Sequence, residues 1–365
     1  MGFLLLGPEE IQDLVSMAEA IDAVEKGYAG GHEYPVINAP RRRVHSPAGV
    51  RISNFPGGVH DMGVIGAATR ADRVVQLEGG ENQEYAYREH PIHVLNDSNT
   101  GHLLALVIGE PVEKTLGYTS LVALRTAATS GVAFKYMVRD NARVAGVFGS
   151  GGQAANQLLA LLSVRPGIKK VKVYSRDPDN RLNFARKYAQ KFDVEITPVD
   201  HPDDVIKGSD AIVCATNTNV ELFDGNLLEP GQHVTGIIGG NVQLVQGGFL
   251  KKARREIDNR TVERADVIVT NLKESVISEK QGDLYEPIEQ GIITLDDIID
   301  LGELPLGLKK GRNNDAEITY HKNNNGTAAS EIAVAMLVYE KAKAAGRGTM
   351  MDLIDPEALR EQFTQ

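Results

Sequence analysis

The segment 146–154, GVFGSGGQA, has residue types and a spacing that suit phosphate binding. Gly149, Gly151 and Ala154 form G-x-G-x-x-A between an apolar run and a helical pattern. In such a turn the first glycine allows a tight bend, the second lets the backbone approach a pyrophosphate, and the third small residue lets the helix pack closely. The helix N-terminus then faces the phosphates. We predict a dinucleotide site, with a glycine turn that binds nothing as the alternative. The predicted contacts are Gly149, Ser150, Gly151, Gly152, Gln153 and Ala154.

The end of the next predicted strand indicates which dinucleotide binds. An acid there would accept a hydrogen bond from the ribose 2′-hydroxyl of NAD. This chain has Ser175 and Arg176 instead, with Arg181 further along. A hydroxyl and guanidinium groups suit a 2′-phosphate, so we favour NADP. Asp177 keeps NAD as an alternative, and a solvated helix face is the competing interpretation of Arg181.

A parallel sheet is needed to position these residues. From residue 143 the chain alternates apolar segments with helical ones. This alternation implies right-handed βαβ units, and the continuous apolar strands imply a sheet that is covered on both faces. Thr216 and Asn217 end one strand, where we expect a ribose or nicotinamide contact. The predicted strands are 143–149, 169–175, 194–200, 211–216, 233–239 and 265–270, and the predicted helices are 152–165, 180–192 and 203–209.

The flanking segments read differently. A helix is predicted to begin at Pro8 and to carry apolar residues from Ile11 to Val24 on one face, and segment 91–109 is predicted to form two strands joined by a polar turn. Helices are predicted at 120–140 and 330–345, with a loop from 307 to 325.

Composition narrows the function classes. The chain has 365 residues, a formal net charge of −10 and one cysteine, Cys214. The negative charge argues against nucleic acid and anionic membranes as partners. A single cysteine rules out an internal disulfide, and no apolar stretch is long enough to cross a membrane. We therefore expect a cytoplasmic protein. No zinc-binding pattern occurs, and Cys214 reads as a core residue.

Longer stretches are similar to one known family. The segment ALRTAATSGVAFKYMVRDNARVAGVFGSGGQA resembles the join between the two domains of the ornithine cyclodeaminase and μ-crystallin family. NDSNTGHLLAL, VCATNTN and EPGQHVTGIIGGN resemble neighbouring family segments. The resemblance implies an α/β fold in which a Rossmann-type dinucleotide-binding domain is inserted in a smaller α+β substrate and dimerisation domain. The implied bounds are 126–324 for the Rossmann domain and 1–125 plus 325–365 for the other. It also implies a homodimer that uses NAD or NADP.

The resemblance assigns roles to particular residues. Arg125 matches the arginine that grips the substrate carboxylate, and Arg41 matches a second one. Thr126, beside Arg125, is expected to contact the cofactor. The family usually carries a lysine near Ala68, and Arg70 on the same strand face is its expected substitute.

Two further departures concern acids. The cyclodeaminases have an aspartate where this chain has Asn241, which cannot take up a proton at neutral pH. They also hold the ornithine side-chain amine with an acid, and the matching stretch VRISNFP has none. His321 is our candidate for the missing acid/base function, with a surface histidine beside a helix cap as the alternative.

These observations predict an NADP-preferring oxidoreductase that interconverts an α-imino and an α-amino acid by hydride transfer at Cα. Two alternatives remain open. One is a deaminating cyclase of the ornithine cyclodeaminase type, and the other is a non-catalytic, NADPH-binding crystallin-like protein.

Overall fold

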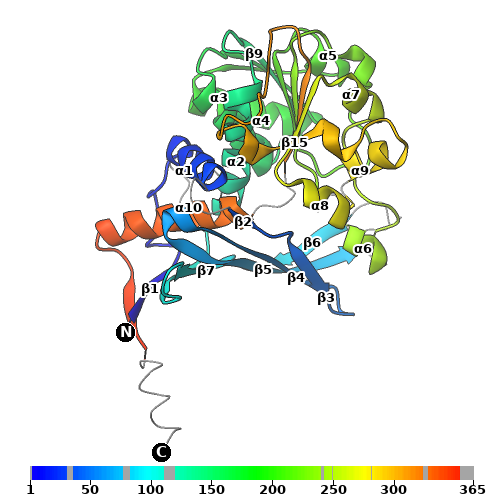
Figure 1. Ribbon diagram of the computed structural model, residues 1–365. Helices are drawn as coiled ribbons and strands as arrows, with labels where there is room; N and C mark the ends of the chain where they lie inside the picture. Colours follow the sequence, from blue (N-terminus) through cyan, green and yellow to red (C-terminus); the bar gives the residue numbers. More distant parts are fainter. Residues whose placement is uncertain are drawn as a thin grey trace, which may run out of the picture.

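The computed structural model describes residues 2–30, 36–76, 83–110, 120–239, 242–248, 250–280, 282–323 and 328–353. They form two sheets, one above the other in Figure 1. The first, here called the mixed sheet, has the order β17-β1-β8-β7-β5-β4-β2, with β3 on β4 and β6 on β5. Its strands are β1 Gly2–Leu6, β2 Ile37–Asn38, β3 Arg42–His45, β4 Val50–Val59, β5 Val64–Gln76, β6 Gln83–Arg88, β7 Ile92–Asp97, β8 Leu103–Ile108 and β17 Thr349–Asp352.

The second sheet, here called the parallel sheet, has the order β11-β10-β9-β12-β13-β16-β14-β15. Each of its recorded strand pairs is parallel. The first four strands along the chain lie in the doubly wound order that creates a crevice where the direction of winding reverses. The strands are β9 Val144–Phe148, β10 Lys170–Tyr174, β11 Glu195–Pro198, β12 Ala211–Cys214, β13 His233–Gly236, β14 Val267–Thr270, β15 Ile298–Asp300 and β16 Thr319–Lys322.

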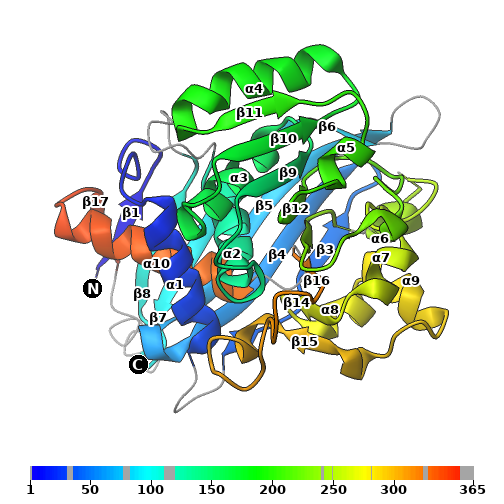
Figure 2. The ribbon, with the colours of Figure 1, turned by 90° about the horizontal axis from the view of Figure 1, so that it is seen from above.

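Helices join the two sheets. Figures 1 and 2 show α10 lying along the mixed sheet, with α1 and α2 nearby. Packing continues from β4, β5 and β7 through α10 and α1 to α2 and α3, and one apolar core runs through these layers. The helices are α1 Met17–Ala29, α2 Leu121–Met137, α3 Gly152–Val164, α4 Pro178–Phe192, α5 Asp203–Ile206, α6 Val242–Gln246, α7 Asn259–Arg264, α8 Lys273–Ser278, α9 Gly282–Glu289 and α10 Ala328–Ala344. In the described residues no helix is both long and apolar enough to cross a membrane.

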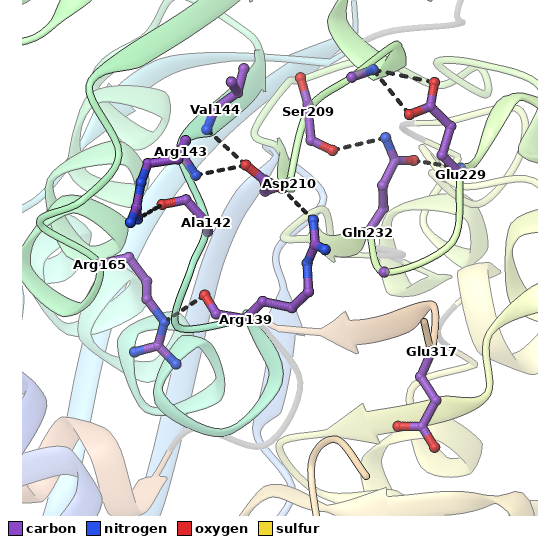
Figure 3. Close-up of polar contacts among 12 residues, drawn as sticks. Arg139, Ala142, Arg143, Val144, Arg165, Ser209, Asp210, Glu229, Gln232 and Glu317 are labelled. Carbon is purple, nitrogen blue, oxygen red and sulfur yellow. Dashed lines mark hydrogen bonds and ion pairs between the residues drawn. The ribbon is translucent and has the colours of Figure 1, made fainter. Parts of the chain in front are cut away.

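Asp210 ties together the amino ends of two central parallel strands (Figure 3). Its Oδ2 accepts hydrogen bonds from the backbone N–H groups of Arg143, at 2.6 Å, and Val144, at 2.9 Å. Its Oδ1 pairs with the Arg139 guanidinium, just beyond α2. This junction fixes α2 relative to the sheet at the edge opposite the carboxyl ends of the strands, where ligands bind in such folds.

The predicted α/β fold is confirmed, with two corrections. The first helix begins at Met17 rather than Pro8, because Ser16 forms the N-cap and a capping box with Glu19. The predicted loop 307–325 contains strand β16, whose polar residues are buried inside the parallel sheet. The predicted domain boundary at 125/126 falls inside α2, and the domain bounds stay a prediction.

Candidate functional site

A groove of about 700 Å³ lies at the carboxyl ends of β9, β10 and β12. This is the crevice at which a doubly wound sheet reverses its strand order. The groove contains the predicted glycine turn and the residues after β10 and β12. Its lining includes Gly149, Ser150, Gly151, Gly152, Gln153, Ser175, Arg176, Asp177, Thr216 and Asn217.

The two glycines of the turn have the geometry that the pattern requires. Gly149 has φ +108°, and a Cβ there would lie 2.3 Å from the Ala215 carbonyl oxygen. Gly151 is the N-cap of α3, and a Cβ there would meet nothing within 4 Å. The backbone at Gly151 is therefore open to a ligand at the helix N-terminus, which suits a pyrophosphate. Ala154 is fully buried, so α3 can lie close to the strands.

The residues after β10 have different roles: some face the groove, and others stabilise the turn and the start of α4. Arg176 is exposed and lines the groove with Ser175. Asp177 is the N-cap of α4 and accepts hydrogen bonds from the backbone of Asp179 and Asn180. The Arg181 guanidinium donates to the Ser175 carbonyl at 3.0 Å and pairs with Asp200, so Arg181 supports the turn from outside the groove lining.

A second cavity, of about 350 Å³, adjoins the groove. The two share Gln153, Thr216 and Asn217, so a molecule in the groove can reach a molecule in the cavity. Most of the cavity wall comes from the mixed sheet and from α2. Seven arginines line it: Arg41, Arg43, Arg51, Arg70, Arg88, Arg125 and Arg254.

Strand register explains why so many polar side chains meet there. Arg43, Ser53 and Arg70 are consecutive partners across β3, β4 and β5, and this set is here called the Arg43–Arg70 row. Two residues away from Arg70 on β5, Ala68 is the cross-strand partner of His93 on β7. Alternate residues of a strand share a face, so both rows point into the cavity.

Arg125 is the buried arginine of the cavity that is best suited to bind a carboxylate. It is 4% exposed, and its Nη2 lies 2.6 Å from Glu331 Oε1. Its Nε and Nη1 are buried without a hydrogen-bond partner in the part of the chain that the structure describes. Nε and Nη1 lie on different edges of the guanidinium, so each offers a charge-assisted donor to a carboxylate oxygen, but the two do not form one bidentate pair.

Glu331 joins Arg125 to His93. The His93 Nε2 lies 3.1 Å from Glu331 Oε2, and both side chains are buried. Burial raises the pKa of Glu331, but Arg125 and the His93 hydrogen bond outweigh it and lower that pKa to about 2. Glu331 is therefore a carboxylate at neutral pH, able to orient the ring of His93.

The other predicted site residues lie in different settings. Arg41 lines the cavity and its Nε donates to Glu279 at 2.8 Å, so this guanidinium also links β3 to the end of α8. Arg70 shares its strand face with Ala68, and both line the cavity. Thr126 is 3% exposed and lines the same cavity. Asn241 lies outside the described residues.

The prediction for His321 is corrected by its position. His321 is fully buried in β16, its Nε2 lies 3.0 Å from Asn271 Oδ1, and it is not among the residues that line either cavity. Burial and Lys322 lower its pKa to about 3. It is neutral at physiological pH, so it cannot deliver a proton to a ligand.

A buried acid supports the floor of the cavity. Glu256 Oε1 accepts hydrogen bonds from the backbone N–H groups of Ile237 and Ile238, both at 2.7 Å. These two residues line the cavity. Burial raises the pKa of Glu256 to about 7, and Lys322 opposes that rise. Sequence reasoning missed Glu256, Glu331 and the role of His93. Their roles depend on contacts between segments that are far apart in the sequence, and no local pattern predicts such contacts.

Known proteins are similar to this chain over most of its length. A Delta(1)-pyrroline-2-carboxylate reductase of Bacillus cereus is 32% identical over 262 residues, 72% of this chain and 74% of the relative. The structure of the Thermococcus litoralis Delta(1)-pyrroline-2-carboxylate reductase, solved with NADH and L-proline, is 29% identical. It covers 95% of this chain and 99% of its own, with a TM-score of 0.78.

An archaeal alanine dehydrogenase dimer with bound NAD is 25% identical, covers 97% of this chain and 100% of its own, and has a TM-score of 0.77. The family model for the ornithine cyclodeaminase/mu-crystallin family matches residues 4–346. A match of this extent spans both sheets and every described element except β17, with β1 matched in part. The chain belongs to the ornithine cyclodeaminase/mu-crystallin family.

Proposed function

We propose that this protein is an NADPH-preferring oxidoreductase that interconverts an α-imino acid and an α-amino acid by hydride transfer at Cα. One observation carries the proposal. A dinucleotide groove opens, at Gln153, Thr216 and Asn217, into a cavity where Arg125 has two buried N–H donors without a partner in the described residues. A protein that only stored a nucleotide would have no use for such a carboxylate clamp.

The groove residues fit a nicotinamide dinucleotide. The open backbone at Gly151 and the N-terminus of α3 would hold the pyrophosphate. Thr216 and Asn217 would contact the nicotinamide end, where the groove meets the cavity. When bound, the reduced cofactor supplies a hydride, and the protein supplies orientation and electrostatics.

Arg125 would hold the substrate carboxylate and so place Cα at the mouth of the groove. In the reductive direction the hydride adds to Cα, and the electron pair of the C=N bond moves to nitrogen, which takes a proton. His93 lines the cavity and is oriented by Glu331, so we propose it as the group that delivers that proton. A fixed carboxylate and a fixed proton donor reduce the entropy cost of reaching the transition state.

The preference for NADPH rests on the end of β10. Tyr174, Ser175 and Arg176 contain no acid that could accept from a ribose 2′-hydroxyl, and Asp177 uses its carboxylate to cap α4. Ser175 and exposed Arg176 line the groove there. Arg176→Gln should lower kcat/KM for NADPH at least tenfold and leave that for NADH nearly unchanged. An unchanged ratio would contradict the preference.

We also propose a homodimer, formed through the face of the mixed sheet opposite to α10. Val44 and Ile52 are cross-strand partners there and are 64% and 45% exposed, and Ile65 on β5 is 39% exposed. Exposed apolar side chains on a sheet face are typical of an interaction surface. The archaeal alanine dehydrogenase noted above is described as a dimer.

The test of the activity is oxidation of NADPH and NADH at 340 nm. The panel contains 2-oxo acids with ammonia or methylamine, and cyclic imines such as pyrroline and piperideine carboxylates. Oxidation that requires an imine, and that is faster with NADPH, would support the proposal. Ammonia release from ornithine with no imine reduction would favour the cyclase instead, and tight NADPH binding with no turnover would favour a binding protein.

A further inference from the structure

A buried carboxyl group lies behind the junction of the groove and the cavity. Thr216 lines both, and its hydroxyl donates to Glu256 Oε2 at 3.3 Å. The Thr218 backbone N–H donates to the same hydroxyl oxygen at 3.2 Å, which fixes the direction in which Thr216 donates. Glu256 is fully buried. This acid is therefore one hydrogen bond away from the place where we propose that the nicotinamide end of the cofactor binds.

The backbone of the cavity floor holds the same carboxyl group in place. Its Oε1 accepts from the N–H groups of Ile237 and Ile238, and the Ile238 carbonyl accepts from Lys322 Nζ at 2.6 Å. The backbone N–H of Glu256 itself donates to Asp283 Oδ1 at 3.0 Å. These contacts come from four separate segments of the chain, so they fix the carboxyl group relative to the junction.

The charge of this buried cluster depends on Glu256. Lys322 is the ion-pair partner of Asp283, and both side chains are buried. One cation and two acids sum to a charge of −1 when Glu256 is ionised and to zero when it is protonated. Burial raises the pKa of Glu256 to about 7, and Lys322 opposes that rise. The charge behind the junction therefore changes near neutral pH.

Other ionisable groups packed around Glu256 keep one charge state in this range. Burial raises the pKa values of Cys214 on β12 and Tyr320 on β16 well above their ordinary values, so both stay neutral. Arg254 and Arg255, the two residues before Glu256, stay positive. Among these described neighbours, a change of pH around 7 therefore acts through Glu256.

We infer that ionised Glu256 shifts the preference of the site toward the oxidised form of the cofactor, NADP⁺ over NADPH. This rests on the proposed function and names a determinant of its direction. The nicotinamide ring is positively charged when oxidised and neutral when reduced, so a fixed carboxylate nearby stabilises the oxidised form selectively. Selective binding of the oxidised form makes the bound reduced cofactor a better hydride donor, which favours imine reduction. By linkage, binding of NADP⁺ must also favour ionised Glu256 and release a proton where this acid is partly protonated.

The test is calorimetry of NADP⁺ and NADPH binding to the full chain from pH 6 to 8.5, in two buffers that differ in ionisation enthalpy. We expect the ratio of Kd for NADPH to Kd for NADP⁺ to rise at least threefold over this range. Near pH 6.5 NADP⁺ should release more protons than NADPH does. The 2′-phosphate is common to both forms, so its own titration cancels in the comparison.

Glu256→Gln keeps an oxygen that can accept from Ile237 and Ile238 and removes the charge. It should abolish both pH effects, weaken NADP⁺ binding at pH 8.5 at least fivefold and change NADPH binding by less than threefold. Glu263→Gln, exposed on α7, is the matched control and should behave like the wild type.

Binding separates this inference from the proposed activity. Selective, pH-dependent binding of NADP⁺ that Glu256→Gln abolishes would support the inference, even if no imine were reduced and the proposed activity failed. A wild-type ratio that does not change with pH would overturn the inference and leave the oxidoreductase intact. A Glu256→Gln variant that keeps the wild-type pH effects, or that loses affinity equally for both forms, would also overturn it. Failure of both forms to bind would overturn the inference and the proposed function together.

Discussion

Ala68 on β5 and His93 on β7 are direct partners across two antiparallel strands, and both face the arginine-lined cavity. The small side chain of Ala68 leaves the neighbouring imidazole room to reach a ligand. The family usually carries a lysine near Ala68, and we expected Arg70 on the same strand face to take its place. His93 brings a titratable group to the adjacent position, and Glu331 orients it.

The first prediction concerns this histidine. His93→Asn keeps a hydrogen-bond donor for Glu331 and removes the titratable ring. If His93 delivers the proton to the imine nitrogen, kcat should fall by about 10²–10⁴-fold, the usual range for loss of a general acid. The KM for NADPH should stay unchanged, because His93 lines the cavity but not the groove.

The measurement is the kcat of steady-state imine reduction at saturating NADPH. His102→Asn, an exposed position after the turn between β7 and β8, is the control and should keep the wild-type kcat. A His93→Asn variant with the kcat of the wild type would exclude His93 as the donor.

The second prediction concerns Arg125. Arg125→Lys keeps one positive charge near Glu331 and removes the two N–H donors of Arg125 that have no partner in the described residues. Loss of a buried charged hydrogen-bond partner costs about 2–5 kcal/mol, so kcat/KM for the imino acid should fall at least 30-fold. Arg186→Lys, exposed on α4, is the matched control. Unchanged substrate kinetics in Arg125→Lys would show that the carboxylate binds elsewhere.

The parts of the fold that local pattern specifies were predictable. The strands between 143 and 270 and the helices predicted at 152–165, 180–192 and 203–209 follow from apolar patterns, and the glycine turn follows from residue spacing. Strand β16 was missed because Thr319, His321 and Lys322 are polar, and their burial depends on partners far along the chain, such as Asn271 and Asp283. Local sequence patterns do not show that a buried polar residue is paired with a residue far along the chain.

The same limit applies to the site. Arg125 was predictable from a motif, whereas Glu331 is more than 200 residues from both of its partners. The first helix was placed too early because the apolar spacing from Ile11 onward continues across Ser16, where the capping box begins the helix. Periodicity identifies a helix better than it identifies its first residue.

A third prediction separates the roles of the two turn glycines. Gly151→Ala adds a methyl group where nothing lies within 4 Å, so the Tm should fall only by the small cost of replacing glycine at a helix N-cap. The methyl group would occupy the approach of the pyrophosphate, and the Kd for NADPH should rise at least tenfold. Gly149→Ala instead forces a non-glycine residue to φ +108° and against the Ala215 carbonyl, so the Tm should fall. Calorimetry and thermal melts measure both. Unchanged cofactor affinity in Gly151→Ala would contradict the placement of the pyrophosphate.

A fourth prediction concerns Glu256. Burial raises the pKa of Glu256 from 4.5 in the unfolded chain to about 7. The folded state therefore binds a proton that the unfolded state releases, and the free energy of unfolding gains from this group below pH 4.5. The gain, about 3 kcal/mol at most, is lost as the pH rises from 4.5 through 7.

Glu256→Gln should flatten that part of the stability profile, measured by urea unfolding at pH 5, 6, 7 and 8. Its amide oxygen can still accept from Ile237 and Ile238, so the cavity floor should remain in place. Glu340→Gln, exposed on α10, should leave the profile unchanged. An identical slope in the wild type and Glu256→Gln would contradict the raised pKa.

The last prediction concerns the proposed dimer face. Ile52 is 45% exposed and faces away from the cavity, since its neighbours Arg51 and Ser53 on β4 both line it. Ile52→Lys would place a charge opposite Val44 on this face of the sheet. A buried, unpaired charge costs several kcal/mol, so the dimer should dissociate to monomers at micromolar concentration. Light scattering after size exclusion measures the mass. Leu182→Lys on α4, at 36% exposure, is the matched control and should stay dimeric. A monomeric wild type, or a dimeric Ile52→Lys variant, would show that this face is not the interface.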